Sequence, residues 1–249
     1  MLNVIRTIIF TLFEIITVVP WGIVCLLIAP LPRKMRYAFT MRWLNIAMWG
    51  SRHILGIKVH IQGQEHLDRS NVILLSKHQS TWETFFYPTH LRRECCYVFK
   101  RELLMVPFFG WGMGLLDMIH INRSKRRDAF EDITRQGKEK LAQGRWIIMF
   151  PEGTRMATGT QGVYRSGGIR LAQNTGATII PVAVNSANCW PKKSFVKTPG
   201  TISVSFGPPI FCEGKTIDAI SLAVESWIET EMRRISPTDY KDPWTPRSN

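Results

Sequence analysis

The residues best suited to catalysis are His78 and Glu83, which belong to the segment KHQSTWE at 77–83. A carboxylate that accepts the Nδ1 proton of a histidine fixes the imidazole tautomer and leaves Nε2 free as a base. The segment follows an apolar run at 72–75 that is typical of a buried strand, and Ser80 can begin a helix. We therefore expect His78 in the turn after a strand, where open α/β sheets place their ligand sites.

The same segment also has a purely structural interpretation. Ser80 and Glu83 fit a capping box, in which a hydroxyl and a carboxylate each accept a backbone N–H group at the start of a helix. Glu83 would then be a helix cap and His78 a loop residue. A second motif favours the chemical interpretation.

That motif is FPEGTR at 150–155, which again follows an apolar run. Arg155 is expected at the end of this strand, and Lys100 and Arg123 at the ends of two further predicted strands. Each alone could be a surface cation. Three cations at equivalent strand ends, on the same side as His78, instead suit a phosphate group, which the planar guanidinium can bind with two parallel hydrogen bonds.

Two neighbouring residues have open roles. Gly153 permits close approach of the backbone to a ligand. Glu152 could bind a glycerol hydroxyl or hold Arg155 in place, and we favour the holding role. Lys77 is a further candidate for phosphate contact, although it is not part of our predicted site.

In combination, these motifs resemble the glycerophosphate and lysophospholipid acyltransferase family, and most of all its lysophosphatidic acid acyltransferases. The resemblance covers residues 57–207, in which His-x4-Glu, KREL (100–103), INR (121–123), FPEGTR and IPV (180–182) follow the family's order. It implies two catalytic residues, His78 and Glu83, and six substrate-binding residues: Lys100, Arg123, Glu152, Gly153, Thr154 and Arg155. The family usually has Asn-His and Asp where this chain has Lys77-His78 and Glu83.

The resemblance implies transfer of a fatty acyl group from acyl carrier protein or acyl-coenzyme A to the free hydroxyl of lysophosphatidic acid. The substrate hydroxyl would be the nucleophile, so that no acyl-enzyme is needed, and backbone N–H groups beside His78 are candidates for the oxyanion site. Ser76 or Ser80 as a covalent nucleophile is the competing mechanism, but neither lies in a G-x-S-x-G elbow. Glycerol-3-phosphate, an ornithine lipid and a lipid A precursor are alternative acceptors.

The composition is strongly basic, with 32 Lys and Arg against 19 Asp and Glu and a formal charge of +13. Such a charge predicts attraction to an anionic membrane or to nucleic acid. A non-catalytic basic protein would leave the ordered motifs unexplained, and no nucleic-acid-binding signature is present, so we predict a membrane partner and no nucleic acid. The five scattered cysteines predict neither disulfides nor a zinc site, and we expect no metal and no cofactor.

The N-terminus predicts membrane association. Residues 2–31 are apolar and contain only two charged residues, Arg6 and Glu14. Residues 33–55 mix cations with aromatic residues, which indicates either an interfacial amphipathic helix, the favoured interpretation, or a helix packed on the core. A single span is possible, whereas the family resemblance favours a two-helix motif in one leaflet. The cationic flank from Arg33 favours the cytoplasm for the main domain. The expected location is therefore the cell inner membrane, with the active site facing the cytoplasm.

Strands that alternate with helices predict an α/β fold with a largely parallel central sheet flanked by helices. Expected strands are 57–61, 72–75, 95–100, 118–122, 146–149, 179–184 and 201–206, and expected helices begin at Ser80, Ser124, Ser166 and Ile217. The predicted units are a membrane-associated segment at 1–55, an acyltransferase domain at 56–236 and an irregular tail at 237–249. Large apolar residues in the 107–114 connection and just after it could be core or an acyl-chain channel, and core is preferred: Phe108, Phe109, Trp111, Met113 and Leu115.

Overall fold

A computed structural model describes residues 1–91, 93–105, 109–121 and 128–246. The part of the chain that it describes forms a seven-stranded sheet in the order β1-β7-β6-β2-β5-β3-β4. All neighbouring strands run parallel except β6 and β7, which are antiparallel. The predicted α/β class with a largely parallel sheet is confirmed. The strands are β1 (Ile57–Gln62), β2 (Val72–Ser76), β3 (Cys95–Lys100), β4 (Ile119–Ile121), β5 (Trp146–Met149), β6 (Thr178–Val184) and β7 (Gly200–Phe206).

The central strands are apolar because both of their faces are covered. Every residue of β2 is buried, as parallel strands between two helical layers require. At the sheet edge, β1 leaves most of its residues exposed. The sequence-based bounds of β3 and β5 match the structure, and β4 begins one residue later than expected, while its expected last residue lies outside the described residues.

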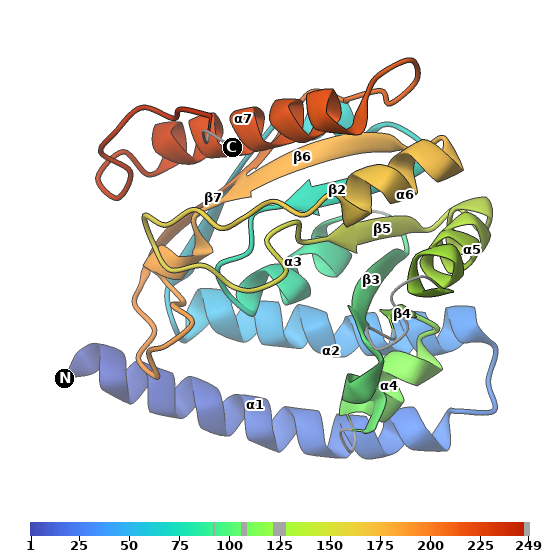
Figure 1. The fold of residues 1–249 in the computed structure, drawn as a ribbon. Coiled ribbons are helices and arrows are strands. Elements are labelled where there is room, and N and C mark those ends of the chain that lie inside the picture. Colours follow the sequence, from blue (N-terminus) through green and yellow to red (C-terminus); the bar gives the residue numbers. More distant parts are fainter. Residues whose placement is uncertain (92, 106–108, 122–127, 247–249) are drawn as a thin grey trace.

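Helices cover both faces of the sheet (Figure 1). One face packs against α5 (Asp128–Ala142), α6 (Gly167–Thr175) and α7 (Ile217–Ile235), and the other packs against α3 (Trp82–His90) and α2 (Arg33–His53), with α1 (Leu2–Leu27) outside α2. Alternate residues of β2 point into the two cores: Ile73 and Leu75 into the first, Val72 and Leu74 into the second. The remaining elements are short: α4 (Phe109–Leu115), η1 (Gln64–Leu67), η2 (Arg101–Met105) and η3 (Ser186–Asn188).

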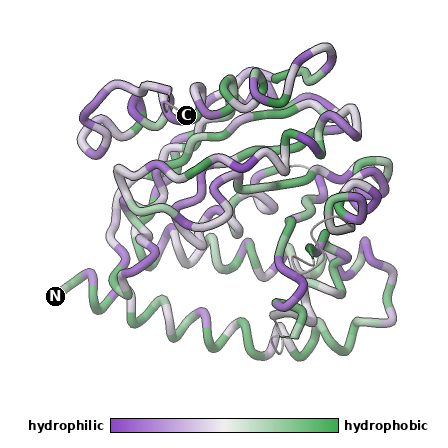
Figure 2. The backbone as a smooth tube through the Cα atoms, viewed as in Figure 1, coloured by the Kyte–Doolittle hydropathy of each residue, from purple (hydrophilic) through white to green (hydrophobic). Residues whose placement is uncertain are grey.

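The N-terminal segment is a helical hairpin whose two helices differ in burial. Tyr37, Leu44 and Ala47 of α2 are buried, and α2 packs against α3. The core-packed interpretation therefore describes α2 better than a helix lying free in a headgroup layer, because its inner face completes the domain. Figure 2 shows α1 as a mostly hydrophobic helix along one side of the molecule.

α1 is long and apolar enough to cross a membrane, and only 6% of its most apolar window is buried. Its inner face contacts the domain through Thr7 and Phe10, the two buried residues of the helix. Large apolar residues outside this contact and outside the cavity are exposed along the helix: Ile5, Ile9, Leu12, Ile16 and Leu27.

Two predicted features fall partly outside the described residues. The expected start of α5 at Ser124 lies outside them, as do residues 247–249 of the tail. Residues 237–246 form no helix or strand, yet Tyr240 is buried and its hydroxyl accepts a hydrogen bond from Gln79 Nε2 at 3.3 Å. The tail therefore closes over the turn that carries His78.

Candidate active site

The two predicted catalytic side chains are in contact. His78 Nδ1 lies 2.9 Å from Glu83 Oε2, and the Glu83 carboxylate is fully buried. The imidazole is 15% exposed and lines a large cavity. Its Nε2 makes no hydrogen bond to a described residue, so the carboxylate orients the ring and leaves Nε2 free to accept a proton.

Glu83 is also the helix cap that the alternative interpretation predicts. Its carboxylate accepts the N–H groups of Gln79 and Ser80 at 2.9–3.0 Å, and Ser80 Oγ accepts the N–H of Trp82 at 2.9 Å. Ser186 Oγ donates a further hydrogen bond to Glu83. Several donors therefore face this buried carboxylate, as a buried charge requires. Glu83 can therefore act both as a helix cap and as the partner of His78, because one carboxylate has enough lone pairs to accept hydrogen bonds from the backbone and from the imidazole.

The FPEGTR turn lies directly against the histidine. The Phe150 ring stacks on the imidazole, with centroids 3.8 Å apart and planes at 17°. The N–H of Met156, just beyond the motif, donates to the carbonyl oxygen of His78 at 2.7 Å. The two motifs meet because β2 and β5 are adjacent parallel strands whose carboxyl ends lie at the same sheet edge.

Lys77 and Glu152 form a buried charge cluster beneath this turn. Lys77 Nζ donates to Glu152 Oε1 at 2.8 Å and to Glu229 Oε1 at 2.7 Å, and all three side chains are fully buried. Arg233 Nη1 lies 3.4 Å from Glu229 Oε2, so that two cations pair with the two carboxylates. The preferred role of Glu152 is therefore wrong, because it holds Lys77 instead of Arg155. Lys77, which we left out of the predicted site, faces the interior.

Burial shifts the titration of this cluster and of the groups around it. It raises the pKa of Glu152, against the opposing effect of the Lys77 ammonium and of the Gly162 N–H donor. It also raises the pKa of the Tyr164 phenol well above its ordinary value. Tyr164 therefore stays a neutral hydroxyl that donates to Glu229 Oε1 at 2.9 Å.

The predicted phosphate-binding residues are placed as follows. Lys100, Gly153, Thr154 and Arg155 line the same cavity as His78, whereas Arg123 lies outside the described residues. Arg155 Nη1 donates to Thr81 Oγ1 at 2.8 Å, which leaves the rest of its guanidinium for a ligand. Gly153 has a φ of +67°, which accounts for glycine at this turn.

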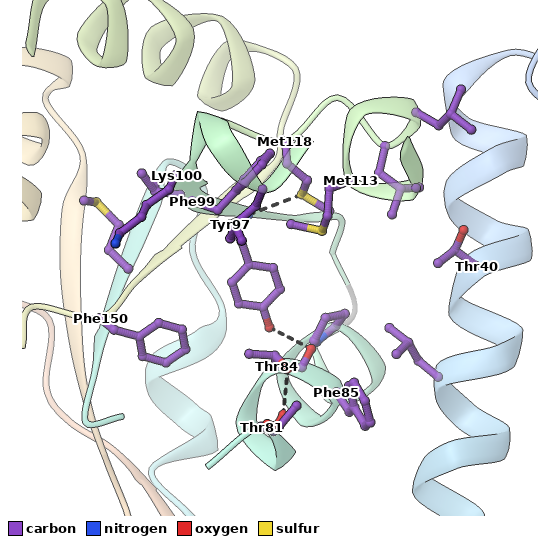
Figure 3. Close-up of a pocket in the computed structure, with 18 of the residues that line it drawn as sticks. Thr40, Thr81, Thr84, Phe85, Tyr97, Phe99, Lys100, Met113, Met118 and Phe150 are labelled. Atoms are coloured by element: carbon purple, nitrogen blue, oxygen red, sulfur yellow. Dashed lines mark hydrogen bonds between the residues drawn. The ribbon is translucent and has the colours of Figure 1, made fainter. Parts of the chain in front are cut away.

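The cavity measures about 1600 Å³, larger than the roughly 300–1,000 Å³ of sites for drug-sized ligands. It extends from His78 to α1 and α2, and Tyr97 crosses it between Phe150 and the methionines Met113 and Met118 (Figure 3). Tyr97 donates to the carbonyl oxygen of Thr84 at 3.1 Å, and burial raises the pKa of its phenol well above the ordinary value.

The apolar residues of the 107–114 connection and its flank divide between core and cavity. Met113 and Leu115 line the cavity, and Met113 also packs against the core as expected. The side chains of Phe108 and Phe109 lie outside the described residues. Trp111 is 45% exposed and does not belong to the core.

Sequence reasoning missed several residues of this region. Arg165 lines the cavity, and its guanidinium lies beside Gly153. If Gly153 were replaced by a residue with a Cβ atom, that atom would lie 3.6 Å from Arg165 Nε. Ser186 follows the carboxyl end of β6, so the strand-end argument that identified His78 could have found it. Glu229 carries no comparable signal, because acidic residues are common in amphipathic helices.

Known proteins resemble this chain in the region of both motifs and over most of its length. The model of the acyltransferase family matches residues 58–185, which contain both motifs. This chain belongs to the acyltransferase family. It is 40% identical over 242 residues to a 1-acyl-sn-glycerol-3-phosphate acyltransferase of Pseudomonas aeruginosa, covering 95% of this chain and 94% of that protein.

A second curated relative and one solved structure are also similar to this acyltransferase. A 1-acyl-sn-glycerol-3-phosphate acyltransferase of Limnanthes douglasii is 30% identical, covering 97% of this chain and 86% of that protein. The crystal structure of the 1-acyl-sn-glycerophosphate acyltransferase of Thermotoga maritima has a similar fold, with a TM-score of 0.75. At 21% identity, it covers 94% of this chain and 97% of that one.

Proposed function

We propose that this acyltransferase moves a fatty acyl group from a thioester of acyl carrier protein or coenzyme A to the sn-2 hydroxyl of 1-acyl-glycerol-3-phosphate. The product would be phosphatidic acid. The observation that carries the proposal is the His78–Glu83 pair at the wall of an apolar cavity that Lys100 and Arg155 also line. The names of the relatives at 40% and 30% identity support this choice of acceptor.

In the proposed mechanism, His78 Nε2 removes the proton of the acceptor hydroxyl as its oxygen attacks the thioester carbonyl. Glu83 holds the imidazole and stabilises the positive charge that it gains. The tetrahedral intermediate then expels the thiolate of the donor, which takes the proton from the His78 imidazolium and leaves as a thiol. The acyl group passes directly to the acceptor, so no acyl-enzyme forms.

Two backbone N–H groups that were candidates for the oxyanion site already have an acceptor. The N–H groups of Gln79 and Ser80, beside His78, already donate to the Glu83 carboxylate. They hold the base in place and are not free for the substrate oxygen. The backbone just after His78 therefore positions Glu83, which in turn orients the imidazole.

The polar and apolar parts of the acceptor suit different parts of the cavity. Lys100 and Arg155 would bind the phosphate, because a guanidinium and an ammonium form charge-assisted hydrogen bonds to phosphate oxygens. Alkyl chains would lie against the inner residues of α1 and α2, among them Val18, Ile23, Met41 and Leu44. Burial of methylene groups there would contribute about 0.8 kcal/mol each.

We further propose that the helical hairpin lies in one leaflet of the cell inner membrane, with the active site facing the cytoplasm. The exposed apolar face of α1 supports lipid contact. The inner face of α1 packs on the domain and lines its cavity. This contact favours a helix that lies along the domain in the membrane surface, and it argues against a helix that leaves the domain to span the bilayer. A lipid acceptor could then enter the cavity from the bilayer.

A panel of acceptors tests the proposed substrate. Purified enzyme would receive a labelled acyl thioester and, separately, lysophosphatidic acid, glycerol-3-phosphate, a lyso-ornithine lipid and a lipid A precursor. We expect product with lysophosphatidic acid at least tenfold faster than with the others. No turnover of lysophosphatidic acid beside turnover of another acceptor would overturn the substrate, and running the panel with both thioesters would identify the donor.

A further inference from the structure

The loop at residues 189–199 connects η3 to β7 and extends from the sheet to α1 (Figure 1). It is joined to α1 at two points. The N–H of Lys197 donates to Thr7 Oγ1 at 3.0 Å, and the Trp190 ring packs edge-on against Phe10, with centroids 5.4 Å apart. The loop therefore lies beside the helix that is proposed to contact lipid.

The outer part of this loop exposes an aromatic ring beside cations. Lys193 and Phe195 are exposed, and 56% of the Phe195 side chain is open to solvent. Lys193 forms no ion pair with a described residue. An exposed phenylalanine next to an unpaired ammonium suits a lipid surface, because the ring can enter the acyl boundary while the cation meets anionic headgroups.

We propose that Lys193 and Phe195 form a second contact with an anionic bilayer, adjacent to the exposed face of α1. This inference rests on the proposed membrane placement of α1 and extends it to a loop 180 residues further along the chain. The positive charge of the loop suits an anionic partner. Its contact with α1 favours lipid over a soluble acidic protein, because an exposed aromatic ring beside an apolar helix face suits the acyl region of a bilayer.

The same loop also contacts the FPEGTR turn, of which Thr154 and Arg155 line the catalytic cavity. Lys192 Nζ donates to the carbonyl oxygen of Arg155 at 3.0 Å and to Thr154 Oγ1 at 3.3 Å. Lys192 thus braces the turn that carries the proposed phosphate-binding arginine, while its neighbours contact lipid. Lipid contact at Lys193 and Phe195 holds this turn at headgroup level, where the phosphate of a lipid acceptor lies.

Vesicle binding of the full chain tests this inference. Phe195→Asp and Lys193→Gln would be compared with wild type and with Leu222→Asp, by flotation with phosphatidylcholine vesicles that contain or lack phosphatidylglycerol. Leu222 is a matched control because it is 51% exposed and belongs to α7, on the opposite side of the molecule from α1 (Figure 1). Equal melting temperatures would establish that all variants fold.

We expect Phe195→Asp to weaken binding roughly tenfold on both vesicle types. Lys193→Gln should weaken it roughly fivefold, and only where phosphatidylglycerol is present. Leu222→Asp should bind as wild type does. Acylation of vesicle-embedded lysophosphatidic acid should fall in parallel with binding, whereas acylation of detergent-dispersed substrate should not change.

Three outcomes would overturn the inference, and they separate it from the proposed function. Binding of Phe195→Asp equal to that of wild type would exclude the loop and leave the α1 contact standing. Absence of wild-type binding would remove both lipid contacts. Unchanged vesicle binding with slower transfer from acyl carrier protein, but not from acyl-coenzyme A, would make the loop a docking surface for that acidic protein.

Discussion

Glu83 links the proposed base to the backbone, because the same carboxylate accepts from His78 Nδ1 and from the N–H groups of Gln79 and Ser80. Rotation of the carboxylate away from the imidazole would break these backbone bonds as well. The ring is therefore held from one side by hydrogen bonds and from the other by stacking on Phe150. Such pre-organisation is what a general base needs, since a loosely held imidazole loses rate.

Glu83→Gln should lower the turnover number by a factor of about 10² or more, because an amide cannot stabilise the imidazolium. It should also destabilise the fold by about 1–3 kcal/mol, because its NH₂ group would meet backbone donors. Glu83→Asp, which keeps the charge, should retain more activity than Glu83→Gln. Steady-state kinetics and thermal melting check both effects, and equal losses in the two variants would refute the role of the charge.

Arg155→Gln should raise the KM for the phosphate-bearing acceptor by roughly 10–100-fold, because hydrogen bonds to charged groups contribute about 1.5–3 kcal/mol. The KM for the acyl donor should change much less. Arg170→Gln is a suitable control, since Arg170 is an exposed cation on α6 outside the cavity. If the two variants gave the same acceptor KM, Arg155 would not be a phosphate ligand.

At the level of elements, adjacent parallel strands bring the motifs together. The carboxyl ends of β2, β5 and β3 deliver His78, the FPEGTR turn and Lys100 to one edge of the sheet. α7 then covers this region from the other face, where Glu229 reaches Lys77 across 152 positions of sequence. The catalytic turn is thus fastened to a helix that contains no residue of the proposed reaction.

Lys77→Met should destabilise the protein by about 3–5 kcal/mol, because it leaves two buried carboxylates with Arg233 as their remaining cation. Adding Glu229→Gln should recover part of this loss, because one of the unpaired charges disappears. Denaturant unfolding of both single variants and the double variant checks this coupling. Additive losses would contradict a shared charge cluster.

How far the sequence predicts the structure depends on whether a feature is local. The bounds of β3, β5 and α7 follow from apolar runs and helical spacing, which depend on neighbouring residues. The His78–Glu83 contact could be predicted for the same reason, because both residues belong to one turn and helix start. The partners of Lys77 could not, since pairing across 152 positions leaves no periodic pattern along the chain. A lysine in place of the family's asparagine was the one available signal.

The whole molecule combines an apolar helix, a basic domain and a cavity between them. α1 is exposed on its outer face and lines the cavity with its inner residues. The formal charge of +13 would draw the domain to anionic lipid. Membrane contact and substrate access are therefore assigned to the same side of the molecule. Charge alone left nucleic acid and membrane both open. The apolar N-terminal sequence and the placement of α1 over the cavity favour lipid.

Replacing both Ile9 and Ile16 by Asp should reduce vesicle binding by at least roughly tenfold, since charged side chains are costly in the hydrocarbon region. The fold should tolerate both changes because these side chains are 50% and 69% exposed. Flotation with vesicles and a melting curve check the two statements. Undiminished binding would show that α1 is not a lipid contact.

The most direct test of the central claim is the transfer of a labelled acyl group from its thioester to lysophosphatidic acid in lipid vesicles, by wild type and by His78→Ala. Wild type should give labelled phosphatidic acid, and the variant should be slower by about 10²–10⁴ with an unchanged melting temperature. Equal rates would contradict the assignment of His78 as the base and leave Glu83 as a helix cap alone.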